Sequence, residues 1–231
     1  MLCLTALLLA LASLALSAPA EKRAQPQGID VSGYQGTVDW AKAKANGVTF
    51  AYIKATEGTT FKSSSFSSQY TGATSAGIIR GAYHFARPDT SGGAAQAKYF
   101  VANGGAWSGE LAQDITTADN PYGSTCYGLS ASAMVAWIQD FSDTYHSSTG
   151  RYPGTQLIYT STSWWTTCTG NSAAFAKNNP LWVARYASAV GALPAGWTYH
   201  TFWQYADSGR NPGDQDVFNG DAAGLKRLAS G

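Results

Sequence analysis

Charged residues are scarce in this chain of 231 residues, where Asp, Glu, Lys and Arg together make up 13%. An average globular domain carries about 25%. The formal net charge is +1, so the sequence lacks the basic surface that binding to nucleic acid requires. We therefore expect no nucleic-acid partner, and most polarity comes from Ser, Thr, Gly and Tyr.

Glutamate is rarer still, because only Glu57 and Glu110 lie beyond residue 23. The three His and three Cys do not show the close spacing of a zinc site. Glycine-rich nucleotide-binding loops and the GxSxG elbow of serine hydrolases are also missing. We therefore expect neither a metal ion nor another cofactor.

Only one long apolar run occurs, at residues 1–18. It ends in small residues and predicts a secretory signal peptide. A membrane anchor is the alternative, but the run is short for a span and no second one follows. Residues 19–23 resemble a propeptide that ends in a dibasic processing site. We expect a secreted protein with one domain at 24–231 and no membrane contact after cleavage.

Processing at this site would change both the charge and the cysteine count. It would remove Glu21, Lys22 and Arg23, which leaves a net charge of zero. Cys3 would be lost with the signal peptide, so Cys126 and Cys168 would remain. Two cysteines in an exported protein are expected to pair, with two free buried thiols as the alternative.

Short apolar runs alternate with helical patterns along the rest of the chain. We expect strands at 28–32, 48–54, 78–85, 111–115, 157–160, 181–186, 200–205 and 216–218. Helices are expected at 39–46, 63–76, 94–102 and 131–148. Alternation of this kind predicts a parallel sheet with right-handed crossovers. The fold class is therefore α/β, an irregular (β/α) TIM-like barrel with about eight strands and few short helices.

The expected strands and the segments that follow them carry polar residues. These residues are Asp30, Glu57, His84, Asp114, Arg185, Gln204 and Asp214. A parallel barrel holds its active site at the carboxyl ends of its strands. Carboxylates that converge on an aromatic-lined cleft indicate glycoside hydrolysis. An Asx turn is the alternative for Asp30, and His84 could be a ligand, a base or a hydrogen-bonded structural residue.

Several motifs in the chain resemble a known family. They read GIDVSGYQG, FAYIKATEG, IRGAYHFARPDT, NPYGSTCYGLS, IYTSTSWW, LWVARY, FWQYADSG and DQDVFNG. In this order they resemble glycoside hydrolase family 25, the Chalaropsis-type lysozymes or N,O-diacetylmuramidases, over nearly the whole chain from Gly28. The resemblance implies a flattened barrel with a long groove. It also implies a secreted, monomeric muramidase that cuts the β-1,4 bond between N-acetylmuramic acid and N-acetylglucosamine in bacterial peptidoglycan.

The resemblance also implies roles for individual residues. Asp30 matches the aspartate of the first strand, and Asp214 matches a late aspartate, with Asp216 where the family often has Asn. Cys126 and Cys168 match a disulfide of related members. The positions expected to line the groove are Tyr34, Tyr52, Tyr83, Trp182, Arg185 and Trp203.

The fourth strand departs from the family pattern. The family has an Asp-x-Glu pair there, whereas this chain reads AQDITTADNPYG. Asp114 matches the Asp that is expected to orient the substrate acetamido group or to stabilise charge, and Thr116 stands where the Glu is expected (Ala118 if NPYG is the anchor). Threonine cannot replace a carboxylic acid, whose general acid help is worth about 10²–10⁴ in rate. Glu110 and Asp119 are possible substitute acids.

The missing glutamate leaves alternatives to an active enzyme. A catalytically impaired barrel that binds peptidoglycan or chitin is the second hypothesis, and a chitinase is disfavoured because no DxxDxDxE run occurs. RYPGTQLIYT is also longer than the family segment, so a misassembled coding sequence is a further hypothesis that sequencing of the transcript would test. For an active enzyme, an acid close to other carboxylates predicts highest activity in mildly acid medium.

Overall fold

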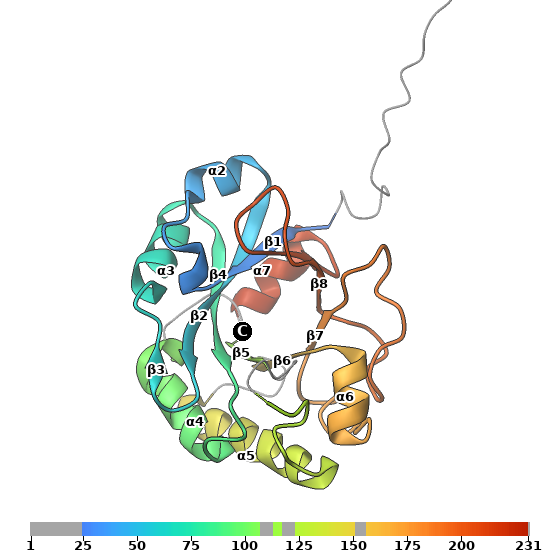
Figure 1. The fold of residues 1–231 in the computed structure, drawn as a ribbon. Coiled ribbons are helices and arrows are strands. Elements are labelled where there is room, and N and C mark those ends of the chain that lie inside the picture. Colours follow the sequence, from blue (N-terminus) through green and yellow to red (C-terminus); the bar gives the residue numbers. More distant parts are fainter. Residues whose placement is uncertain (1–24, 107–112, 117–122, 151–155, 231) are drawn as a thin grey trace, which may run out of the picture.

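The computed structural model describes residues 25–106, 113–116, 123–150 and 156–230. Its strands are β1 (Gln27–Val31), β2 (Val48–Glu57), β3 (Phe61–Lys62), β4 (Ile79–Phe85), β5 (Gln113–Thr116), β6 (Gln156–Thr160), β7 (Leu181–Ala184), β8 (Phe202–Ala206) and β9 (Asp214–Phe218). They form one sheet in the order β1-β9-β8-β7-β6-β5-β4-β2-β3, and β1 also pairs with β2. That last pairing closes eight strands into a barrel (Figure 1). The expected irregular α/β barrel is confirmed.

The last strand departs from the expected parallel arrangement, because β9 is antiparallel to both β1 and β8. Only residues 207–213 join β8 to β9, and a parallel crossover needs a dozen or more residues. The two strands therefore form a hairpin. Gly213 precedes β9 with a φ of 78°, and a Cβ there would collide with the carbonyl oxygen of Asp30.

The helices are mostly short and surround the barrel (Figure 1). They are η1 (Gly33–Gln35), α2 (Trp40–Ala45), α3 (Phe66–Ser75), α4 (Gly93–Phe100), η2 (Val101–Gly105), α5 (Ala131–Thr149), α6 (Thr162–Thr169) and α7 (Ala222–Ser230). The expected start of α5 is confirmed, since the Ser130 side chain accepts a hydrogen bond from the backbone N–H of Ala133. Helices α6 and α7 were not expected. In α6, aromatic and β-branched residues give weak helix propensity.

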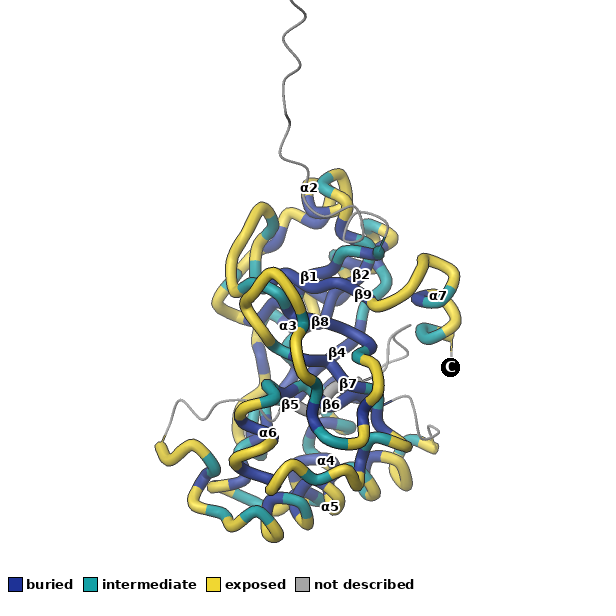
Figure 2. Tube along the Cα trace, turned by 90° about the vertical axis from the view of Figure 1, so that its right-hand side faces the viewer, coloured by how far each residue is buried: buried dark blue, intermediate teal, exposed yellow. Residues whose placement is uncertain are grey.

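The hydrophobic core has two layers, one inside the barrel and one between the barrel and its helices. In Figure 2 the strands of the barrel are mostly buried, whereas exposed residues lie mainly in the helices and loops around them. Leu225 of α7 belongs to the inner layer, so α7 covers one end of the barrel (Figure 1). The inner layer consists of Phe50, Tyr52, Tyr83, Leu157, Trp182, Phe202, Phe218 and Leu225. Because large rings fill this interior, polar groups can gather only at the two ends of the barrel.

Gly28 is required by the packing of this inner layer. A Cβ at this position would collide with the ring of Phe50, which is fully buried. We expect Gly28→Ala to lower the free energy of unfolding by about 1–3 kcal/mol, since overpacked cores force side chains off their rotamers. Chemical denaturation measures the loss. Gly92→Ala, where a Cβ meets open space, should stay within about 1 kcal/mol of wild type; equal losses would contradict the packing argument.

A disulfide bond joins Cys126 and Cys168, which confirms the expected pairing. It connects the segment before α5 to the last turn of α6, and Cys168 is buried. Over the described ranges, no helix combines the length and the apolar character that crossing a membrane requires.

Candidate active site

Two carboxylates face each other where β9 closes the barrel. Asp30 lies near the end of β1, Asp214 begins β9, and the two are direct partners in the antiparallel register. Like charges at such positions repel each other. The Nε2 amide of Gln204 donates hydrogen bonds to Asp30 Oδ2 (2.6 Å) and to Asp214 Oδ2 (3.1 Å). One side chain of β8 therefore holds both carboxyl groups.

Two phenols fix the orientation of this glutamine. The hydroxyls of Tyr159 and Tyr186 donate to Gln204 Oε1 at 2.6 and 2.9 Å. With its oxygen engaged by two donors, the amide must present its N–H groups to the carboxylates. Burial raises the pKa of Tyr159 well above its usual range and that of Tyr186 to about 12. Both phenols therefore keep their protons and remain donors.

A third carboxyl group lies beneath this pair. Asp216 is fully buried, and the indole N–H of Trp182 donates to its Oδ1 at 2.9 Å. Its other oxygen, Oδ2, is buried and has no hydrogen-bond partner among the described residues. Burial and the negative charge of Asp30 raise the pKa of Asp216 well above its usual range. Asp216 therefore keeps its proton at a pH where an exposed aspartic acid has lost it.

The three carboxyl groups retain protons at a pH where an isolated aspartic acid has lost them. Burial and the charge of Asp214 raise the pKa of Asp30 to about 7, although the hydrogen bond from Gln204 lowers it in part. Burial and the charge of Asp207 raise the pKa of Asp214 to about 6. A carboxylic acid with a pKa near the working pH is what general acid catalysis needs. We call Asp30, Asp214 and Asp216 the carboxyl cluster.

Three of the predicted groove residues lie inside the barrel. Tyr52, Tyr83 and Trp182 are buried, and the rings of Tyr52 and Trp182 are 4.6 Å apart. Through its bond to Asp216, Trp182 supports the carboxyl cluster from within the barrel. Direct contact of these residues with a substrate stays a prediction.

The other predicted groove residues lie elsewhere. Tyr34 in η1 is 94% exposed. Arg185, just after β7, is also exposed, and its carbonyl oxygen accepts a hydrogen bond from the indole of Trp203 at 2.8 Å. Trp203 packs in the outer core layer. Substrate contact stays a prediction for these three residues as well.

The fourth predicted strand is β5, which contains Asp114 and Thr116. Asp114 is in register with Tyr83 of the neighbouring β4, and Tyr83 belongs to the inner core layer. Glu110 and Asp119, the possible substitute acids, lie outside the described residues.

Sequence reasoning did not single out Tyr159 and Tyr186. Tyr159 is the second-to-last residue of β6, and Tyr186 follows the carboxyl end of β7. The position just after a strand was the available signal for Tyr186. For Tyr159, no local feature separates a hydrogen-bonded phenol from an ordinary core tyrosine.

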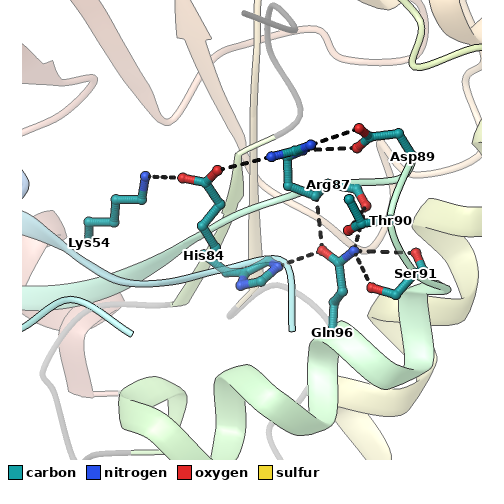
Figure 3. Close-up of polar contacts among 8 residues, drawn as sticks. Lys54, His84, Arg87, Asp89, Thr90, Ser91 and Gln96 are labelled. Carbon is teal, nitrogen blue, oxygen red and sulfur yellow. Dashed lines mark hydrogen bonds and ion pairs between the residues drawn. The ribbon is translucent and has the colours of Figure 1, made fainter. Parts of the chain in front are cut away.

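His84, which the sequence left open between three roles, is a buried structural residue (Figure 3). Its Nε2 lies 2.9 Å from Gln96 Oε1, which also accepts from the backbone N–H of Arg87. Nε2 is therefore the donor, and Nδ1 accepts from Thr56 Oγ1 at 2.7 Å. Nearby, Glu57 forms ion pairs with Lys54 and Arg87.

We expect His84 to make the protein less stable in acid. Burial lowers its pKa to about 4 from the ordinary 6.5. Its contribution is complete above pH 6.5 and is lost as the pH falls through 4, because the unfolded chain binds the proton first. The loss should be about 3 kcal/mol. Urea denaturation of wild type and His84→Asn at pH 7 and pH 4 measures it, and parallel pH dependences would contradict it.

A metal site is not evident in the part of the chain that the structure describes, where no three His, Cys, Asp or Glu side chains are grouped suitably.

Comparisons with known proteins agree with this geometry. Residues 29–214 match the family description "Glycosyl hydrolases family 25". The chain is 53% identical to an N,O-diacetylmuramidase of Arthroderma benhamiae over 96% of both chains. It resembles the solved structure of a muramidase from Acremonium alcalophilum (TM-score 0.85, 59% identity, covering 89% of this chain and 99% of that one). It also resembles a family 25 lysozyme from Aspergillus fumigatus (TM-score 0.86, 48% identity, covering 90% and 100%). The chain therefore belongs to the glycosyl hydrolases family 25.

Proposed function

We propose that this protein is a muramidase that hydrolyses the β-1,4 bond between N-acetylmuramic acid and N-acetylglucosamine in bacterial peptidoglycan. The observation that carries the proposal is the carboxyl cluster, whose raised pKa values suit acid catalysis of glycosidic cleavage. Membership of family 25, whose similar members include N,O-diacetylmuramidases, supports the same reaction.

In this proposal Asp30 donates the proton to the leaving glycosidic oxygen. Of the two half-buried members of the cluster, Asp30 has the higher pKa, near 7. Asp214 provides negative charge for the oxocarbenium-like centre. Asp114 orients the acetamido group, and its place in register with Tyr83 supports that role. Because Asp30 is the proton donor in this proposal, the residue at position 116 does not have to be an acid.

Exposed rings near the carboxyl ends of the strands would hold the glycan. Tyr34 follows β1 and Tyr186 follows β7, and they are 94% and 55% exposed. Arg185 would contact the acidic groups of the wall polymer. We further propose that the protein is secreted after cleavage of residues 1–18 and 19–23 and acts as a monomer.

A binding function is the second candidate, and it is favoured by Thr116 at the position where the family resemblance predicts a glutamate. Such a protein would bind peptidoglycan without cutting it. The two candidates differ in the release of new reducing ends, not in binding.

Purified bacterial walls provide the test. We expect clearing of a wall suspension, with every new reducing end carried by N-acetylmuramic acid after borohydride reduction and hydrolysis. Reducing N-acetylglucosamine would contradict the bond assignment. Sedimentation of the protein with walls, without any new reducing ends, would contradict the hydrolase and support the binding protein.

The activity should depend on pH through the carboxyl cluster. Since the proton donor Asp30 must be protonated, activity should fall as the pH rises through about 7. Asp214→Asn removes the like charge that raises the pKa of Asp30, so the alkaline limb of the profile should move to lower pH. Initial rates between pH 4 and pH 9 measure both effects. An unchanged limb in the variant would contradict the coupling.

A further inference from the structure

A cavity of about 330 Å³ opens at the end of the barrel opposite the carboxyl cluster. It lies where β7 and β8 begin and where the antiparallel β9 ends, and Leu228 of α7 also lines it. The cluster lies at the other ends of the same strands, on the order of 15 Å away along five residues of strand. Small-molecule sites occupy roughly 300–1,000 Å³, so this cavity could accept about one sugar unit.

An exposed aromatic ring stands at the rim of this cavity. Among the described residues, four large hydrophobic side chains are exposed, and Tyr34, Phe61 and Tyr186 follow the carboxyl ends of β1, β2 and β7. The fourth, Tyr199, is 67% exposed, precedes β8 and lines the cavity. An aromatic side chain with this much exposed surface does not contribute to the hydrophobic core. It can, however, stack on the apolar C–H face of a pyranose.

The wall around the ring is rigid and offers unused polar groups. The indole N–H of Trp197 donates to the Asn179 carbonyl oxygen at 2.8 Å, and the Asn219 side chain donates to the His200 carbonyl oxygen at 2.8 Å. By contrast, Tyr199 has no hydrogen bond to any described residue. The side chains of Lys177 and Asn178, which also line the cavity, have none to the described residues either.

The charge of the cavity favours an acidic ligand. Lys177 is exposed, and no Asp or Glu is among the lining residues. An ammonium group, an amide and a phenol ring match the lactyl carboxylate, the acetamido group and the C–H face of an N-acetylmuramic acid unit that carries no stem peptide, because a peptide would convert this carboxylate into a neutral amide. A neutral chitin unit would leave Lys177 without a partner.

We propose that this cavity is a second, non-catalytic binding site for one acidic N-acetylated sugar of the wall glycan. Tyr199 stacks on the sugar ring, and Lys177 pairs with its carboxylate. This inference rests on the proposed function for the identity of the polymer. The site would hold the enzyme on the insoluble wall while the opposite end of the barrel cuts a strand.

The test separates binding from cleavage. In an Asp30→Asn background, sedimentation with walls measures affinity, and we expect Tyr199→Ala to weaken it about fivefold, the typical contribution of an aromatic contact. Tyr199→Phe, which keeps the ring, should retain wall affinity. Lys177→Ala should weaken binding of the N-acetylglucosaminyl-N-acetylmuramic acid disaccharide but not of chitotriose. Lys98→Ala, at an exposed lysine on α4, is the charge-matched control.

Turnover provides the second readout. With the native Asp30, Tyr199→Ala should slow clearing of insoluble walls and leave the rate on short soluble glycan fragments unchanged. Equal affinity of Tyr199→Ala and its parent for walls would overturn the inference. If neither protein cuts any substrate but wall binding still depends on Tyr199, the proposed hydrolase fails and the binding site stands.

Discussion

Asp30→Asn should reduce wall clearing by about 10²–10⁴-fold, the usual contribution of general acid catalysis. Asparagine has nearly the shape of the acid and can still accept the hydrogen bond from Gln204, so the fold should persist. It cannot, however, release a proton to a leaving oxygen. Initial clearing rates at pH 5 to 6, together with a circular dichroism spectrum and a melting curve, measure the effect.

Two further variants make this result specific. Asp143→Asn removes a carboxylate from the exposed surface of α5 and should leave the rate unchanged. Asp214→Asn should reduce the rate less than Asp30→Asn, because Asp214 provides charge rather than a proton in the proposed mechanism. An Asp30→Asn variant with more than about a tenth of the wild-type rate would show that another group is the acid. Glu110 would then be the first residue to replace.

Removing the disulfide should have the largest effect on stability. The bond closes a loop with a sequence separation of 42 residues, which corresponds to about 4 kcal/mol of chain entropy. For a chain of this size, that loss lowers the melting temperature by about 10 °C. The double variant Cys126→Ala/Cys168→Ala avoids placing a hydroxyl at the buried position of Cys168, and scanning calorimetry measures the change.

Reduction of the wild-type protein provides the matching control. Dithiothreitol should lower the melting temperature of the wild type to that of the double variant and leave the variant itself unchanged. A double variant that melts within about 2 °C of the oxidised wild type would contradict the estimate. The loop between the two cysteines would then already be ordered in the unfolded chain.

The barrel could be predicted from sequence because its strands carry a strong local pattern. Apolar runs ending in polar residues located the eight barrel strands, and a spaced apolar face located α5. The antiparallel direction of β9 follows from the length of its connection to β8, because residues 207–213 are too few for a parallel crossover. Helix α6 was missed because its Trp and Thr residues favour helix only when Ser161 caps it and its indoles are buried.

The site was predictable in part. Asp30 and Asp214 were found because each lies near a strand end, and their direct pairing is a consequence of the β9 hairpin. The orientation of Gln204 depends on Tyr159, whose role arises only when β6 and β8 pair with the two sides of β7 in the folded sheet. The burial of Tyr52 and Trp182 reflects the narrow interior of the barrel. Neither the orientation of Gln204 nor the burial of Tyr52 and Trp182 can be predicted from a local stretch of sequence.

The antiparallel strand β9 also determines how early during synthesis the carboxyl cluster can form. Asp30 emerges early from the ribosome, but its partner Asp214 belongs to the last strand, and the two meet only when the cylinder shuts. Pairing across so many intervening residues is slow to form. If Asp30 and Asp214 act as proposed, a nascent or truncated polypeptide is inert, and the ability to cut glycan arises in the same step that completes the native topology.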